Sequence, residues 1–108
     1  MSKFTLADLE KRVHERAKAS ASESYTRALL DQGVSQCAKK FGEEAIETVL
    51  AALQEDKSRL IAEAADLLYH LLVVMEARGV TLAEVEAALQ KRTAQSGHEE
   101  KASRPRGS

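Results

Sequence analysis

The segment from Leu60 to Met75 constrains this chain more than any other, because it is apolar almost all the way round. A helix with so extensive an apolar surface must be buried on most sides. Three polar residues nevertheless interrupt it, namely Glu63, Asp66 and His70. At about 100° per residue their side chains fall within roughly 60° of arc. They therefore form one narrow polar stripe along a helix that otherwise avoids water.

The two carboxylates of this stripe need a partner. Ionised carboxylates on a buried helix are costly unless they are paired, hydrogen-bonded or bound to a metal. A second acidic group precedes them in the sequence and consists of Glu43, Glu44 and Glu47. Because acid facing acid adds only repulsion, this arrangement favours a cation between the two groups.

The spacing of the acids supports a shared metal site. Glu44 and Glu47 are three residues apart, and so are Glu63 and Asp66. At that spacing two carboxylates share a helix face and can converge on one ion. A turn near residues 55–58 predicts an antiparallel hairpin, with residue 47 opposite 66 and residue 50 opposite 63. Four carboxylates without a thiolate favour Mg²⁺ or Mn²⁺ over Zn²⁺.

Other interpretations of these polar residues stay open. A run such as Glu43 to Glu47 is usually a solvated helix face that pairs with lysines, here Lys39 and Lys40. His70 can be a ligand, but a partner of a ligand or a core histidine with a satisfied hydrogen bond is favoured. Di-iron bundles also carry internal carboxylates, but they use Glu-x-x-His on two helices, a motif that the predicted core helices lack.

Helical spacing recurs along the chain and predicts an all-α fold of four or five helices. We expect helices over about 5–18, 25–32 and 58–78, a third helix between residue 35 and the turn at 55–58, and a fifth from residue 82. The expected N-terminal caps are Thr5, Ser24, Ser35 and Thr81, and the expected C-terminal stops are Gly33 and Gly79.

The helix over 58–78 also predicts the assembly. It is too apolar for a five-helix monomer in which so little else can cover it. We therefore expect a homodimer, or a higher oligomer built from dimers. The third and fourth helices would then lie in a bundle shared by two chains, so that dimerisation completes the fold.

Composition restricts the class of function. With 108 residues the chain forms one small domain, and a net charge of −1 argues against binding to nucleic acid. Cys37 is the only cysteine, which excludes an intramolecular disulfide, and it is interpreted as a small buried apolar residue. No apolar run resembles a signal peptide or spans a bilayer, so we expect a soluble cytoplasmic protein without a membrane partner.

The C-terminal segment differs from the rest of the chain. We predict one domain over residues 1–93 and a disordered polar tail over 94–108, because the tail has too few apolar side chains to offset the entropy of ordering. Truncation after Thr93 is therefore expected to leave the melting temperature and the activity nearly unchanged. Thermal unfolding and initial rates of the truncated chain check this, and a large loss of either would show that the tail docks on the domain.

The acidic pattern also carries a resemblance. Glu44-x-x-Glu47 followed by Glu63-x-x-Asp66 resembles the all-α nucleotide pyrophosphohydrolases of the MazG-like superfamily. Three segments narrow this resemblance to the phosphoribosyl-ATP pyrophosphohydrolase family: Ser24-Tyr25-Thr26, Lys40-Phe-Gly-Glu43-Glu44 and Asp66-Leu-Leu-Tyr69-His70. The match covers about residues 4–92. One departure is that residues 19–22 lack the proline often seen there in the family.

This resemblance implies a MazG-like bundle and an enzyme of histidine biosynthesis. The family hydrolyses phosphoribosyl-ATP to phosphoribosyl-AMP and pyrophosphate, depends on Mg²⁺ and forms homodimers. It implies metal ligands at Glu44, Glu47, Glu63 and Asp66, and catalytic roles for Glu43 and Glu47. It implies substrate contacts from Lys40, Ser24, Tyr25, Thr26 and Arg27. A housekeeping pyrophosphatase for non-standard nucleoside triphosphates and a non-catalytic helical dimerisation module stay open as alternatives.

Overall fold

The computed structural model describes residues 3–54 and 56–94, and these residues form five α-helices and no strand. In chain order the helices are α1 (Leu6–Arg16), α2 (Tyr25–Asp31), α3 (Val34–Leu53), α4 (Lys57–Arg78) and α5 (Leu82–Thr93). The predicted all-α class is confirmed. Apart from Ala94, the segment predicted to be a disordered tail lies outside the described residues. No helix in the described part of the chain is long and apolar enough to cross a membrane.

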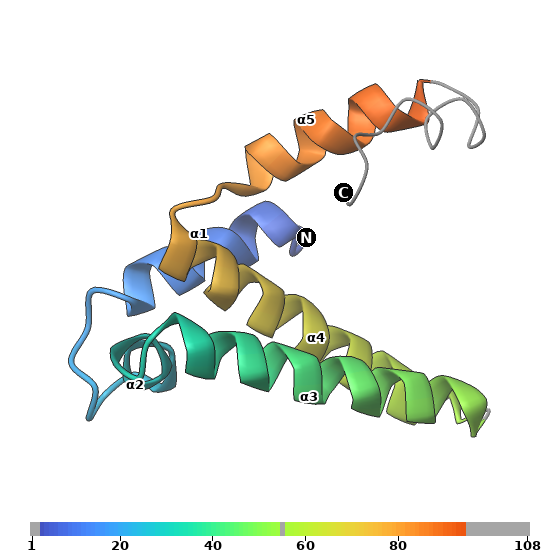
Figure 1. The fold of residues 1–108 in the computed structure, drawn as a ribbon, viewed down its shortest axis with the longest axis horizontal. Coiled ribbons are helices and arrows are strands. Elements are labelled where there is room, and N and C mark those ends of the chain that lie inside the picture. Colours follow the sequence, from blue (N-terminus) through green and yellow to red (C-terminus); the bar gives the residue numbers. More distant parts are fainter. Residues whose placement is uncertain (1–2, 55, 95–108) are drawn as a thin grey trace.

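The antiparallel hairpin of α3 and α4 is the longest feature of the fold (Figure 1). Thr48 of α3 lies opposite Glu63 of α4, since its Oγ1 is 3.2 Å from the backbone carbonyl of Glu63. The predicted register, with residue 50 opposite residue 63, is therefore wrong by about half a helical turn. The reason is a shorter turn than expected, because α3 continues to Leu53 and Asp56 already caps α4.

Two predicted capping boxes are confirmed, at the starts of α1 and α5. The hydroxyl of Thr5 accepts from the backbone N–H of Asp8, whose carboxylate accepts the N–H of Thr5. Thr81 and Glu84 repeat this exchange. A side-chain cap of this kind stabilises a helix by about 1 kcal/mol, so both starts are determined locally.

The predictions for the junction between α2 and α3 are wrong. Gln32, in the right-handed conformation, ends α2, and Gly33 is the N-cap of α3 rather than a left-handed stop. Ser35 caps nothing, because α3 has already begun at Val34. At φ 95° and ψ 168° Gly33 turns the chain directly from one helix into the next, a conformation that glycine adopts without steric cost. The prediction for Gly79 is confirmed, since it ends α4 in the left-handed region.

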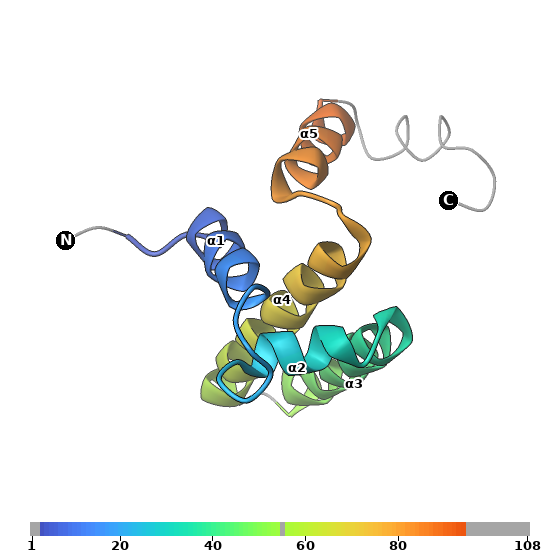
Figure 2. The ribbon, with the colours of Figure 1, turned by 90° about the vertical axis from the view of Figure 1, so that its left-hand side faces the viewer.

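The core lies where α1 and α2 pack against α3 and the C-terminal half of α4 (Figure 2). Its buried apolar side chains are those of Val13, Leu29, Cys37, Leu72, Val73, Met75 and Leu82. The thiol of Cys37 is buried as predicted and donates to the carbonyl of Leu29 at 3.4 Å. Burial raises the pKa of the Cys37 thiol, so this group is a core residue rather than a nucleophile.

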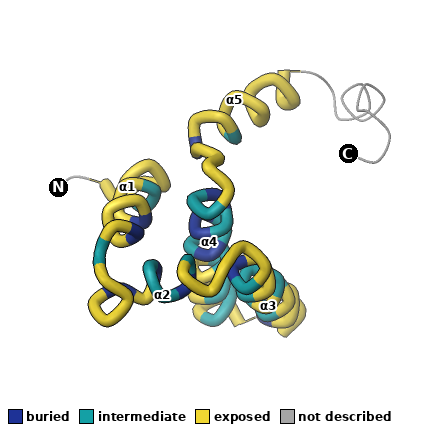
Figure 3. Tube along the Cα trace, turned by 60° about the vertical axis from the view of Figure 1, so that its left-hand side comes forward, coloured by how far each residue is buried: buried dark blue, intermediate teal, exposed yellow. Residues whose placement is uncertain are grey.

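The N-terminal half of α4 is only partly covered within one chain, and much of α3 is exposed as well (Figure 3). Ile61 and Leu68 on α4 are exposed, and so are four large apolar side chains of α3. We call this set the apolar strip, and it consists of Ile46, Val49, Leu50, Leu53, Ile61 and Leu68. The expectation that α4 is buried on most sides therefore holds only for its C-terminal half, because α1 and α2 do not reach the rest.

α5 leaves the end of α4 and stands apart from the hairpin (Figures 1 and 2). Its first residue, Leu82, is buried, and the N–H of Leu82 donates to the Glu10 carboxylate of α1 at 2.7 Å. Further along, Leu89 is exposed. This helix is therefore anchored to the fold at its N-terminal end.

Candidate functional site

Three carboxylates from the two helices of the hairpin converge. Glu44 of α3 and Glu63 and Asp66 of α4 each offer an oxygen atom, and these atoms lie within 4.8 Å of one another. Glu44 and Glu63 are half-buried, whereas Asp66 is exposed. The polar stripe predicted on α4 thus opens to solvent in the single chain. A set of carboxylate oxygens is what hard divalent cations prefer, so these residues fit such an ion.

Thr48 joins the two helices at this acidic group. Its hydroxyl lies 2.7 Å from the backbone carbonyl of Glu44, one turn earlier on α3, and 3.2 Å from the carbonyl of Glu63 on α4. One hydroxyl proton is therefore shared between the backbone carbonyls of two acidic residues, with the shorter contact to Glu44. Sequence reasoning missed Thr48, although a hydroxyl four residues after Glu44 was a signal available in the sequence.

The carboxylates of the acidic group repel one another. Partial desolvation is the largest cause that raises the pKa of Glu63, followed by the negative charges of Glu44, Glu47 and Asp66, while Arg59 opposes the shift. Ionisation of Glu63 is therefore disfavoured by its own neighbours. A cation among these carboxylates removes this repulsion, which is the physical reason to read the group as a metal site.

The structure does not bring Glu47 into the group of three. Its Oε2 lies 3.0 Å from Nη2 of Arg59, which reaches across from α4 and also contacts the side chain of Gln54. Glu47 lies near Glu63, since its charge raises the pKa of Glu63, but its carboxylate pairs with Arg59 rather than joining the other three acids. Sequence reasoning did not single out Arg59, whose signal is a basic residue four positions before Glu63. A metal-ligating role for Glu47 stays a prediction.

Another acid of α3, Glu43, forms an ion pair instead of joining the three converging carboxylates. Lys40 Nζ lies 3.5 Å from a carboxylate oxygen of Glu43, one turn along the helix. The expected helix-surface ion pair is therefore present at Glu43, next to the converging carboxylate of Glu44. Both residues remain accessible to a ligand, since neither side chain is buried.

His70 is buried one turn beyond Asp66. Its ring is 6% exposed, and Nδ1 has no hydrogen-bond partner among the described residues. The prediction of a core position is confirmed, but the predicted satisfied hydrogen bond is missing at this nitrogen. Burial lowers the pKa of His70 more than the nearby charges of Glu44 and Asp66 raise it, so the imidazole is held neutral.

The four residues predicted to contact substrate at the start of α2 are used very differently by the fold. Ser24 caps α2 and donates to the carbonyl of Arg16 at 3.0 Å. Arg27 donates to the carbonyl of Ala17 and pairs with Asp31. Thr26 is buried and bonds to the hydroxyl of Tyr69 at 2.5 Å. Tyr25, in contrast, is 58% exposed, which makes it the most exposed of the four.

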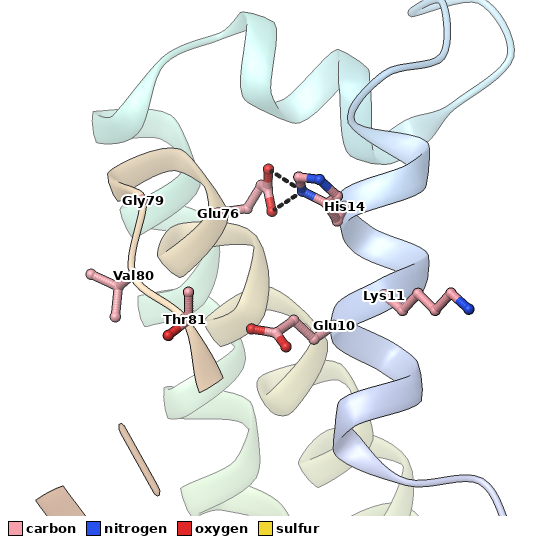
Figure 4. Close-up of a pocket in the computed structure, with 7 residues that line it drawn as sticks. All are labelled: Glu10, Lys11, His14, Glu76, Gly79, Val80 and Thr81. Atoms are coloured by element: carbon pink, nitrogen blue, oxygen red, sulfur yellow. Dashed lines mark hydrogen bonds and ion pairs between the residues drawn. The ribbon is translucent and has the colours of Figure 1, made fainter. Parts of the chain in front are cut away.

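A hollow of about 390 Å³ lies elsewhere, between α1 and the turn from α4 to α5 (Figure 4). His14 faces Glu76 across it, with Nδ1 to Oε2 at 3.2 Å. The side chain of His14 is 58% exposed and pairs with this carboxylate. At 1.5 Å per residue, the hollow begins about 15 Å along α4 from Asp66. It is therefore separate from the acidic group.

The fold and the acidic group define a class of protein, namely small helical proteins in which a hairpin brings carboxylates of both helices together. Comparison with known sequences narrows this class. A sequence model described as phosphoribosyl-ATP pyrophosphohydrolase matches residues 6–93. The chain belongs to the phosphoribosyl-ATP pyrophosphohydrolase family.

Relatives of nearly equal length support this membership. The chain is 62% identical to phosphoribosyl-ATP pyrophosphatase 1 of Bradyrhizobium diazoefficiens, over 96% of this chain and 98% of the relative. It is also 62% identical to the phosphoribosyl-ATP pyrophosphatase of Azorhizobium caulinodans, over 96% and 95% of the two chains. A third relative, phosphoribosyl-ATP pyrophosphatase 1 of Rhodopseudomonas palustris, is 57% identical over 98% and 99%.

Proposed function

We propose that this chain hydrolyses phosphoribosyl-ATP to phosphoribosyl-AMP and pyrophosphate, the second step of histidine biosynthesis, in the cytoplasm. One observation carries the proposal: carboxylate oxygens of Glu44, Glu63 and Asp66 lie within 4.8 Å of one another, on a chain 62% identical to proteins named for this reaction. Cleavage of a polyphosphate chain needs concentrated positive charge, and these acids are suited to hold it.

We assign Mg²⁺, with Mn²⁺ as a substitute, to Glu44, Glu63 and Asp66. Glu47 is the fourth predicted ligand, and it joins them only if its carboxylate leaves Arg59, with which it pairs at 3.0 Å. When bound, Mg²⁺ supplies neutralisation of the negative charge that develops on the pyrophosphate leaving group. The chain contributes the fixed hairpin on which these carboxylates are held.

The remaining polar residues are assigned to water and phosphate. A carboxylate, Glu43 or Glu47, orients the attacking water and accepts its proton as the water adds to the α-phosphorus. The bond from that phosphorus to the bridging oxygen then breaks, and the oxygen leaves with pyrophosphate. Lys40 binds a phosphate oxygen in place of Glu43, its present partner at 3.5 Å.

The predicted contacts from α2 differ in how readily they reach a substrate. Tyr25 is open to solvent and needs no rearrangement. Ser24, Thr26 and Arg27 already bond within the fold. Their assignment to substrate therefore requires that these hydrogen bonds be shared or exchanged, and we place them behind Tyr25 as direct contacts.

We also propose that the enzyme is a homodimer formed through the apolar strip. Ile46 and Val49 of α3 and Ile61 of α4 are each more than half exposed, at 62%, 58% and 62%. Large apolar surfaces of this kind mark interaction sites in soluble proteins. A second copy that covers the strip completes the bundle and buries the open half of α4.

The substrate assignment is tested by pyrophosphate release from a panel of nucleotides, with Mg²⁺ and with a chelator. We expect metal-dependent release from phosphoribosyl-ATP with a kcat/KM at least about 100-fold above that for deoxynucleoside triphosphates, because contacts to the added ribosyl phosphate discriminate between them. Similar values for all nucleotides would instead identify a housekeeping pyrophosphatase. If no nucleotide releases pyrophosphate, the result would indicate that the chain is a non-catalytic helical dimerisation module.

A further inference from the structure

We infer that the exposed ring of Tyr25 is the stacking platform for the adenine base of the substrate, and that Tyr69 and Thr26 hold this ring in place. The inference rests on the proposed function, since it assigns one part of that substrate to a surface beside the acidic group. The geometry of the aromatic rings and their position beside the hairpin both support this inference.

Three aromatic rings form a fixed cluster at the junction of α2 and α4. The rings of Tyr25 and Tyr69 are stacked, with centroids 6.5 Å apart and planes 22° from parallel. The ring of His70 stands edge-on to both, at 6.4 Å and 85° from Tyr25 and 5.0 Å and 76° from Tyr69. These offset and perpendicular arrangements are the ones that aromatic pairs favour.

Burial decreases across this cluster toward solvent. Thr26 is 1% exposed and bonds to the Tyr69 hydroxyl at 2.5 Å, which fixes the middle ring. His70 is buried, whereas Tyr25 is 58% exposed. The cluster thus has a rigid base and one open ring. When a nucleobase stacks on the Tyr25 ring, the tyrosine side chain loses little conformational entropy. Tyrosine has only two side-chain torsions, and the neighbouring rings already restrict them.

The position of the cluster selects a nucleotide base as the occupant. Asp66, Tyr69 and His70 stand at positions i, i+3 and i+4 of α4 and so share one face, about one turn or 5.4 Å apart along the helix. A single ribose separates a nucleotide base from its α-phosphate. Phosphates held at the carboxylates therefore place the base at the rings.

Tyrosine fluorescence tests this directly. The chain has two tyrosines and no tryptophan, so all intrinsic emission comes from the two stacked tyrosine rings. Titration of the full chain with AMP in the presence of Mg²⁺ is expected to quench this emission saturably, after correction for absorption by adenine. Ribose 5-phosphate and pyrophosphate, which lack a base, should leave the emission unchanged. Equal responses to all three probes would overturn the inference.

Substitutions of Tyr25 give the second test. Tyr25→Leu is expected to raise KM for phosphoribosyl-ATP about ten-fold with little change in kcat, because stacking holds the base equally in the ground state and the transition state. Tyr25→Phe keeps the ring and should restore most of the loss. Phe4→Leu is the matched control, because Phe4 is an aromatic side chain of similar exposure, at 53%, on another part of the surface.

Two outcomes separate this inference from the proposed function. If the unaltered chain releases pyrophosphate from phosphoribosyl-ATP but Tyr25→Leu keeps its KM, the stacking role is wrong and the function stands. If the unaltered chain is inactive on that substrate, the proposed function is wrong, whatever the role of Tyr25. Sedimentation of Tyr25→Leu at assay concentration completes the test. A mass lower than that of the unaltered chain would overturn the inference by showing that Tyr25 acts through subunit contact.

Discussion

Replacing Asp66 by asparagine is expected to reduce pyrophosphate release by more than about 100-fold while the protein stays folded. Loss of a residue that merely supports a metal ligand costs about 10- to 100-fold in affinity or activity, so loss of a ligand should exceed that range. Asp66 is exposed and has a carboxylate oxygen within 4.8 Å of oxygens of both Glu44 and Glu63. Initial rates at saturating Mg²⁺, together with circular dichroism, measure the two effects separately.

The same substitution should not weaken the metal-free protein. Partial desolvation raises the pKa of Glu63 most, and the negative charges around it raise it further, so the ionised carboxylates repel one another. An amide at position 66 removes part of this repulsion, so the metal-free melting temperature should stay level or rise. Mg²⁺ at about ten times its Kd should stabilise the unaltered chain by about 1.4 kcal/mol, or several degrees, and this gain should shrink in Asp66→Asn.

Two further variants help to interpret the result for Asp66→Asn. Glu86→Gln removes one charge from an exposed position of α5 and should change neither rate nor Mg²⁺ response. Glu47→Gln separates two roles, because Glu47 pairs with Arg59 at 3.0 Å. A loss of activity and of Mg²⁺ response there would make Glu47 a ligand or catalytic group, whereas a modest loss of stability alone would make it a structural partner. Unaltered turnover and Mg²⁺ dependence in Asp66→Asn would refute the metal site itself.

Val49→Lys is expected to convert the protein from dimer to monomer at micromolar concentration. Val49 is 58% exposed within the apolar strip, and the proposed interface brings the same strip from two chains together. Each dimer would then bury two added ammonium groups in one interface. Like charges at an interface cost several kcal/mol, which corresponds to a Kd raised about 100-fold or more. Sedimentation velocity across a dilution series measures the change.

A matched variant tests whether the position, rather than the lysine, is responsible. Leu6→Lys places the same charge on α1, at another exposed apolar residue outside the strip, and should leave the dimer intact. If the unaltered chain already sediments as a monomer, the proposed assembly is wrong. If Val49→Lys remains a dimer, the interface lies on another surface. The exposed helix α5 is the next surface to test.

Much of the fold could be predicted from the sequence because local interactions determine it. The boxes of Thr5 with Asp8 and of Thr81 with Glu84 satisfy backbone groups within three residues, so the starts of α1 and α5 are encoded in four-residue segments. The stop at Gly79 depends on one left-handed residue. Ser24 caps α2 through the N–H of Arg27 in the same way. Helical periodicity predicted the helices themselves but not the junction of α2 and α3, where Gly33 rather than Ser35 is the N-cap of α3.

The helical repeat is enough to predict that acids three residues apart on each of two helices share a face. Which of these acids meet depends on how α3 packs against α4. Thr48 lies opposite Glu63, and the turn between the two helices is short. In this packing carboxylate oxygens of Glu44, Glu63 and Asp66 lie within 4.8 Å of one another, while the carboxylate of Glu47 pairs with Arg59. The stacking of Tyr25 on Tyr69 likewise joins residues of two helices, α2 and α4. Such contacts depend on packing between distant segments, which no local pattern specifies.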